Sequence, residues 1–213
     1  MVEVIPSIIA KDYKELEEKI RAVEPYVERV QIDIMDGIFV QNRTMDGMAE
    51  LQKLETDLAI EIHLMVNKPE NHIPRFLETK ADKFLVHWET TQKFQECINL
   101  VKDSDKIFGA VLNPETGHEP LGEFTEQLDL IQFMTVSPGA YGAKFIDDVL
   151  DKMSDFHFFY PDIPIQVDGG VNLITAPKLI QAGAKILVAG SYIFDSDNIG
   201  EAINNLREII NSK

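Results

Sequence analysis

Segments typical of β-strands and of α-helices alternate along the whole chain, and this alternation restricts the fold more than any other feature. Strands are expected at residues 2–9, 30–35, 58–66, 82–88, 107–112, 130–136, 163–167 and 185–189. Helices are expected at 12–23, 47–54, 69–78, 91–101, 120–124, 145–157, 174–182 and from 191 to about 210. Such alternation implies parallel strands joined by helical crossovers. Eight units in 213 residues predict an α/β fold, a closed (β/α)₈ TIM barrel forming a single domain over residues 1–213.

An open, doubly wound sheet is the competing fold. It usually has fewer strands and a recognisable loop where the strand order reverses. No Gly-x-Gly-x-x-Gly motif follows the first expected strand, and we find no linker, low-complexity tract or second domain. The closed barrel is therefore the preferred interpretation.

Charge and cysteine content limit the partners and the compartment. The formal net charge of −16 argues against nucleic acid or an anionic membrane surface as a partner. Cys97 is the only cysteine, which excludes an internal disulfide and fits a reducing cytoplasm. We see no signal peptide and no apolar stretch long enough to span a bilayer. A phosphorylated substrate would be repelled at long range, so its binding would need local donors.

The stretch from Val30 to Gly37 contains the first functional candidate. Alternate side chains of a strand share a face, so Gln31, Asp33 and Met35 point one way and the two isoleucines between them point the other. If the isoleucines pack beneath helices, Asp33 lies inside the barrel. A buried carboxylate is costly unless it is paired, hydrogen-bonded or bound to a cation.

Polar residues gather at the carboxyl ends of the expected strands, where barrels of this class form their active sites. The set is Ser7, Gln31, Asp33, His63, His87, Asn113, Asp168 and Ser191. Asp33, His63 and Asp168 would face a common centre. They could bind a divalent metal, or the two aspartates could serve as acid and base on opposite faces of a substrate.

Apolar and glycine-rich segments complete this rim. Three methionines at strand ends could form an adaptable apolar wall that excludes water from an intermediate: Met35, Met65 and Met134. Three turns could cradle a phosphate with backbone N–H groups aided by helix dipoles: Pro138–Ala143, Gly169–Gly170 and Gly190–Ser191.

Six motifs in order resemble the ribulose-phosphate 3-epimerase family. They are Ile5-Pro-Ser-Ile-Ile-Ala, Ile32-Asp-Ile-Met-Asp-Gly-Ile-Phe-Val, Ile62-His-Leu-Met-Val, Met134-Thr-Val-Ser-Pro-Gly, Val167-Asp-Gly-Gly-Val-Asn and Val188-Ala-Gly-Ser. The resemblance runs over nearly the whole chain. It implies a (β/α)₈ barrel and an isomerase of carbohydrate metabolism, in the pentose phosphate pathway, that interconverts ribulose 5-phosphate and xylulose 5-phosphate.

The resemblance also implies roles for individual residues. Asp33 and Asp168 match the family's catalytic acid and base, which also bind a divalent metal that stabilises a cis-enediolate, and His63 matches a metal-binding histidine. Substrate-binding positions are matched by Ser7, His63, Met35, Met65, Met134, Gly139, Gly142, Gly169, Gly170, Gly190 and Ser191. The family commonly forms dimers or hexamers, so a homo-oligomer is expected.

Three segments depart from the family pattern. Gln31 stands where the family has a fourth metal ligand, a histidine. Because an amide oxygen is a weaker ligand that suits harder cations, the metal (Zn, Fe, Mn or Mg) is expected to be bound weakly, to be a different ion, or to be absent. The segment Ile38-Phe39-Val40-Gln41-Asn42 stands where the family has His-Phe-Val-Pro-Asn. In the mobile loop, Gly139-Ala140-Tyr141-Gly142-Ala143 stands where the family has Gly-Phe-Gly-Gly-Gln, so Tyr141 replaces a glycine.

Three functions are compared. The preferred one is epimerisation of a ketose phosphate, with a ketohexose 6-phosphate as the nearest variant substrate. The alternative is a non-catalytic or weakly active sugar-phosphate-binding barrel, favoured by Gln31 and Tyr141. A decarboxylase of the same superfamily would need an Asp-x-Lys-x-x-Asp arrangement, but Met35 stands at the lysine position.

Overall fold

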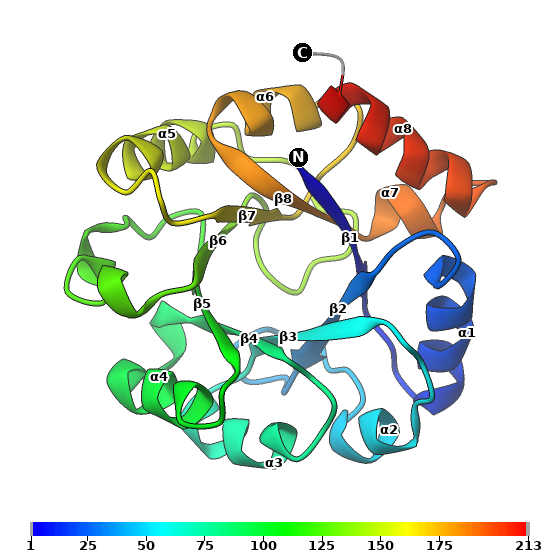
Figure 1. Ribbon diagram of the computed structural model, residues 1–213, viewed down its shortest axis with the longest axis horizontal. Coiled ribbons are helices and arrows are strands. Elements are labelled where there is room, and N and C mark those ends of the chain that lie inside the picture. The colour runs from blue at the N-terminus through cyan, green and yellow to red at the C-terminus, as the bar shows by residue number, and fades with distance from the viewer. Residues whose placement is uncertain (1, 212–213) are drawn as a thin grey trace.

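The computed structural model describes residues 2–211 and has a closed barrel of eight parallel strands, each paired with its neighbours in sequence order and β8 with β1 (Figure 1). The strands are β1 (Glu3–Ile8), β2 (Arg29–Met35), β3 (Ala59–Met65), β4 (Lys83–His87), β5 (Ile107–Leu112), β6 (Leu130–Met134), β7 (Ile165–Asp168) and β8 (Ala184–Ala189). The predicted (β/α)₈ TIM barrel is confirmed.

Helices surround the barrel on its outside (Figure 1). They are α1 (Tyr13–Val23), α2 (Met48–Lys53), α3 (Ile73–Leu77), α4 (Phe94–Lys102), α5 (Val149–Phe159), α6 (Ala176–Gln181), α7 (Ser191–Phe194) and α8 (Ile199–Asn211). Short 3₁₀ helices occur at Pro69–Asn71, Trp88–Thr90, Glu119–Leu121 and Thr125–Gln127. None of the helices described in residues 2–211 is both long and apolar enough to cross a membrane.

Helix α1 shows how the sequence specifies these elements locally. The side chain of Asp12 accepts a hydrogen bond of 2.9 Å from the backbone N–H of Glu15, which caps the first turn. Leu16, Ile20 and Val23 recur at helical spacing and are buried against the barrel. The cap and the apolar stripe together explain why the predicted boundaries of this helix are confirmed.

Four predicted helices differ from the structure. Residues 69–78 form a 3₁₀ turn followed by the short α3, and residues 120–124 form no α-helix, because Pro120 and Gly122 disfavour one and only 3₁₀ turns form. Helix α5 begins at Val149 rather than at residue 145, because residues 145–148 still belong to the loop, where Ile146 donates its N–H to the carbonyl of Thr135. The last predicted helix is divided into α7 and α8.

The strands divide their side chains between two environments, as the alternation predicts. Ile32 and Ile34 of β2 belong to the large apolar core between the strands and the helices. Gln31 and Asp33 point into the barrel, where they meet side chains of β3 and β7. The barrel therefore has an apolar outer core and a partly polar interior, and the site lies in that interior.

Candidate active site

Strand register places polar side chains at two heights inside the barrel. In the pairing of β2 with β3, Asp33 is level with His63, and Gln31 is level with Glu61, two residues earlier. We call the set nearer the strand ends the upper layer; it consists of Asp33, His63 and Asp168. We call the set one step below the lower layer; it consists of Gln31, Glu61, Lys83, Gln132 and Gln166.

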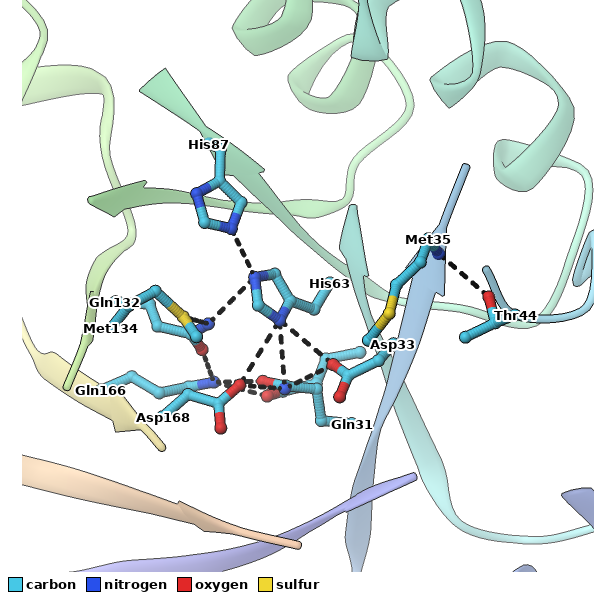
Figure 2. A network of polar contacts seen from close by, with 11 residues as sticks. Gln31, Asp33, Met35, Thr44, His63, His87, Gln132, Met134, Gln166 and Asp168 are labelled. Carbon is cyan, nitrogen blue, oxygen red and sulfur yellow. Dashed lines mark hydrogen bonds and ion pairs between the residues drawn. The ribbon is translucent and has the colours of Figure 1, made fainter. Parts of the chain in front are cut away.

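The upper layer brings together the three residues that were predicted to face a common centre (Figure 2). One ligand atom from each of Asp33, His63 and Asp168 lies within 4.8 Å of the others, and all three residues are buried. His63 Nδ1 is 3.1 Å from Asp33 Oδ1 and 3.4 Å from Asp168 Oδ2. This group could hold a metal ion, and the two carboxylates are close enough to act on one small substrate.

The protonation of His63 follows from its neighbours. Burial alone would lower the pKa of this imidazole, but its contacts with Asp168 and Asp33 outweigh burial and raise the pKa to about 9. The ring therefore carries a positive charge at neutral pH. This charge lies between the two carboxylates and partly balances them.

His87 supports His63 from behind. The two Nε2 atoms are 2.9 Å apart, and the rings are stacked. Burial and the charge of His63 lower the pKa of His87 to about 4, although Glu89 opposes this shift. A neutral His87 can accept the Nε2 proton of His63, which leaves its own proton on Nδ1, 3.4 Å from Glu89 Oε2.

The two aspartates differ in surroundings. Burial raises the pKa of Asp33, and repulsion from Asp168 raises it further, whereas hydrogen bonds from His63 and Gln31 oppose the shift. Asp33 is therefore a carboxyl group that takes up a proton more readily than an exposed aspartate.

The lower layer is a closed polar network. Gln166 Nε2 lies within hydrogen-bond distance of three acceptors, Glu61 Oε1 (2.5 Å), Gln132 Oε1 (2.8 Å) and Gln31 Oε1 (3.3 Å). Glu61 also forms a buried ion pair of 2.7 Å with Lys83. Burial raises the pKa of Glu61, and Lys83 opposes this shift.

Gln31 connects the two layers. Its Nε2 donates to Asp33 Oδ1 (2.9 Å) and to Asp168 Oδ2 (2.7 Å), as Figure 2 shows. The amide nitrogen, not the amide oxygen, thus points toward the group that could hold a metal. The three residues Asp33, His63 and Asp168 fit a divalent cation, whereas Gln31 in this orientation does not act as a fourth ligand.

A cavity of about 60 Å³ lies above the upper layer. Its lining includes both aspartates, the three methionines and every serine and glycine that the sequence predicted to bind substrate: Ser7, Asp33, Met35, Met65, Met134, Gly139, Gly142, Asp168, Gly169, Gly170, Gly190 and Ser191. Among the described residues that line it there is no Lys or Arg. An anion bound here must therefore be held by backbone N–H groups and hydroxyls.

The glycines of this rim are required by the backbone. Gly139, Gly142, Gly169 and Gly170 all have φ between +60° and +109°. A Cβ atom at Gly169 would lie 2.5 Å from a methyl group of Val136. Since α7 is only four residues long, the dipole support predicted for the Gly190–Ser191 turn is small, so an anion there would depend on the turn's own N–H groups.

The methionines line the cavity in two separate pieces. Met35 and Met65 pack together with Val40, whereas Met134 belongs to another apolar cluster, with Leu85 and Leu130 among its members. The three methionines therefore do not form the single continuous wall that the sequence suggested. The apolar lining instead faces the cavity from two sides.

The loop after β6 covers the cavity and is fastened at two points. Tyr141 Oη donates to Asp195 Oδ1 (2.8 Å), and Asn42 Nδ2 donates to the carbonyl of Gly139 (2.6 Å). The loop residues Ala140, Tyr141 and Ala143 therefore line the cavity together with its two glycines.

Some predicted rim residues lie elsewhere. His63 is fully buried beneath the cavity rather than in its lining, and His87 lies behind it. Asn113 is near Glu89, to which its backbone N–H donates, and it does not line the cavity.

Sequence reasoning missed four of the five lower-layer residues. The signal for them was present, because each stands two or four positions from a predicted rim residue, and alternate side chains of a strand share a face. Gln166 precedes Asp168, Glu61 precedes His63, Gln132 precedes Met134, and Lys83 precedes Leu85 and His87.

Comparison with known proteins agrees with this geometry. Residues 3–194 match the model of the "Ribulose-phosphate 3 epimerase family". A ribulose-phosphate 3-epimerase of Bacillus subtilis is 38% identical over 214 residues, with 97% of this chain and 99% of that protein covered. The chloroplastic ribulose-5-phosphate-3-epimerase of Arabidopsis thaliana is 35% identical, with 96% of this chain and 75% of that protein covered.

Solved structures show the same fold at low sequence identity. The 3-hexulose-6-phosphate synthase from Salmonella typhimurium superposes with a TM-score of 0.75 at 15% identity and covers 98% of both chains. The orotidine 5′-phosphate decarboxylase from Pyrococcus horikoshii has a TM-score of 0.69 at 15% identity. These similarities concern the barrel alone.

Proposed function

The chain belongs to the ribulose-phosphate 3-epimerase family, and from this premise we propose that it epimerises a ketose phosphate, ribulose 5-phosphate to xylulose 5-phosphate, by proton transfer between Asp33 and Asp168. One observation carries the mechanism. Two buried carboxylates, on β2 and β7, border the same cavity and share one hydrogen-bond donor.

The reaction needs one base and one acid on opposite faces of the carbon next to the ketone. One aspartate removes the proton from that carbon, and the electrons move into an enediolate. The other aspartate, protonated at the start, delivers a proton to the opposite face, so the net proton count of the enzyme does not change. The raised pKa of Asp33 favours this residue as the one that holds the proton in the resting enzyme.

The remaining cavity residues bind and shield the substrate in this proposal. Backbone N–H groups of the turns Gly169–Gly170 and Gly190–Ser191, together with the loop 138–143, hold the phosphate, and Ser7 contacts the sugar. The methionines exclude water around the reacting carbon, which strengthens the electrostatic interactions there. The net charge of −16 repels a phosphate at long range, and no cationic side chain lines the cavity to compensate. Phosphate binding in this proposal therefore needs N–H donors that are already correctly oriented before the substrate arrives.

A divalent metal would be held by Asp33, His63 and Asp168, and His63 would give up its Nδ1 proton to become a ligand. Bound there, its positive charge would stabilise negative charge that develops on the substrate oxygens. Zn, Fe, Mn and Mg are the proposed candidates, with weak binding expected because Gln31 offers an N–H to this centre rather than a lone pair.

Four further properties are proposed without being part of the mechanism. Residues 1–213 form one barrel domain, the protein acts in the cytoplasm, it binds neither nucleic acid nor membranes, and it forms a homo-oligomer. Each follows from the charge, the single cysteine or the family membership.

The experiment is deuterium exchange into ribulose 5-phosphate in heavy water, followed by NMR, with chelator-treated protein and with added Zn²⁺, Mn²⁺ or Mg²⁺. Deuterium should enter at the carbon beside the ketone as xylulose 5-phosphate forms. Asp33→Asn and Asp168→Asn should each abolish exchange, whereas the matched control Asp46→Asn, outside the cavity, should retain it. Substrate binding without exchange under every metal condition would instead identify a non-catalytic sugar-phosphate-binding barrel.

A further inference from the structure

The side chain of Gln31 is fully buried, and both of its polar atoms are engaged. Nε2 donates to the two aspartates that flank the cavity floor and lies 3.4 Å from Nδ1 of His63. An amide nitrogen has two protons, and here each proton serves one carboxylate. This nitrogen occupies the position between the carboxylates toward which a cation would be drawn.

The orientation of the Gln31 amide is determined from both ends. Its Oε1 faces the Nε2 donor of Gln166 at 3.3 Å. A rotation of the amide by half a turn would place its oxygen against two carboxylate oxygens and its nitrogen against the nitrogen of Gln166. Both contacts would be repulsive, and the two carboxylates alone already favour an amide donor that points upward.

Gln166 is itself held in this orientation by the rest of the lower layer. The two protons of its Nε2 serve the nearer acceptors, Glu61 Oε1 (2.5 Å) and Gln132 Oε1 (2.8 Å), so the contact of this nitrogen with Gln31 Oε1 at 3.3 Å is a weaker, shared one. Glu61 is kept in place by the ion pair with Lys83. The Gln31 amide is therefore oriented first by the two carboxylates, and the lower layer adds a weaker preference for an oxygen beside the Gln166 nitrogen.

We propose that Gln31 is a positioning residue that bridges Asp33 and Asp168 with its N–H groups and thereby competes with a divalent cation, instead of ligating it. The bridge holds the two carboxylates in the geometry of the proposed reaction when no metal is bound. A cation can enter only after the amide turns or withdraws. The proposal concerns the site of the proposed function but makes a claim about metal affinity that can be measured without any substrate.

The test is a titration of chelator-treated full-length protein with Co²⁺ alone, which reports affinity by calorimetry and coordination by visible absorption. If Gln31 were a ligand, Gln31→Leu would weaken binding. Under the proposal the change in Co²⁺ affinity has the opposite direction, because Gln31→Leu removes the competing donor. We expect Co²⁺ to bind about tenfold more tightly or better, which is a typical change in metal affinity for substitutions next to metal ligands.

A second variant and a matched control sharpen this result. Gln166→Met releases the Gln31 amide to turn and should also tighten Co²⁺ binding, by less than Gln31→Leu. The matched control is Gln95→Leu, because Gln95 lies on α4 outside the barrel and its amide contacts Asn99 and Gln127 rather than either layer. Its Co²⁺ affinity should stay within about twofold of the parent.

Weaker or unchanged Co²⁺ binding by Gln31→Leu and Gln166→Met would overturn the proposal. If no form binds Co²⁺, the side-chain amide signal of Gln31 in a ¹H–¹⁵N spectrum, assigned by its loss in Gln31→Leu, decides. Its protons should exchange slowly with water and shift strongly in Asp168→Asn, and fast exchange, like that of an exposed glutamine, would contradict the bridge. Because none of these readouts involves turnover, a failure here is distinct from a failure of the epimerase proposal.

Discussion

The upper and lower layers of the barrel interior contain similar kinds of side chains but differ in how their hydrogen-bonding capacity is used. In the lower layer, amides, a carboxylate and an ammonium contact one another inside the closed barrel. In the upper layer, Asp33 and Asp168 border a cavity. The comparison teaches that polarity alone does not make a reactive centre; a reactive group also needs an open side toward a substrate.

The largest expected effect is the loss of turnover in Asp33→Asn, a variant of the upper layer. We expect turnover to fall by about 10³-fold or more, within the range for loss of a general acid or base. The free energy of unfolding at pH 7 should not fall, because burial and Asp168 already disfavour the charge of Asp33. Steady-state kinetics measures the change in turnover, and urea unfolding measures the change in the free energy of unfolding. A large loss of stability would show that Asp33 is a structural residue.

Lys83→Met, in the lower layer, should have the converse effect. Removal of the ammonium leaves Glu61 buried without its ion-pair partner, and we expect a loss of about 3–5 kcal/mol in the free energy of unfolding. Turnover of the folded protein should change by less than it does in Asp33→Asn. Lys14→Met is the matched control; its partner Glu18 is exposed, so its loss should be about 0–1 kcal/mol. Equal losses in the two variants would remove the distinction between the buried and the exposed pair.

The histidine pair gives a smaller, pH-dependent effect. His87 has its pKa lowered to about 4 in the folded protein, so between pH 4 and its ordinary value of 6.5 the unfolded chain binds more protons than the folded one. The free energy of unfolding should therefore fall as the pH drops from 6.5 to 4, by up to roughly 1.4 kcal/mol per pH unit from this group. Urea unfolding at several pH values measures the slope. His87→Phe should have a shallower slope in this window, and an unchanged slope would assign the acid sensitivity to other groups.

The smallest expected effect concerns the loop that covers the upper layer. Tyr141→Phe removes the hydrogen bond to Asp195 and should raise KM about two- to tenfold with little change in kcat, because one neutral-to-charged hydrogen bond positions the loop without touching the reacting carbon. Tyr26→Phe, far from the cavity, is the control. A large fall in kcat would mean that the loop takes part in arranging the acid and base.

Most of the fold could be predicted from the sequence because the barrel repeats one simple pattern. Each strand is a short apolar run, and helices such as α1 carry both a cap and an apolar stripe. The predictions were wrong where neither signal was present, as at residues 120–124, which form 3₁₀ turns, and at the start of α5, where loop hydrogen bonds replace the first helical turn.

The candidate site was predicted for the residues that stand at strand ends. Asp33, His63 and Asp168 do lie together, and the predicted glycines do line one cavity, while their roles remain proposals. The orientation of the Gln31 amide was not predictable, because the sequence does not state which of two nearly isosteric atoms faces upward. That choice depends on the carboxylates of Asp33 and Asp168, and Asp168 is 137 positions away in the chain.

The register between β2 and β3 has a consequence for how this protein gains activity as it folds. Asp33 is level with His63 along the same ladder that sends Ile32 and Ile34 outward. A shift of β2 by one residue would turn its acidic and amide groups toward the helices and its isoleucines into the cavity. A barrel with this register error would therefore lose both the apolar core between β2 and the helices and the acidic groups of the active site. Correct strand register is thus a condition for stability and for activity at the same time.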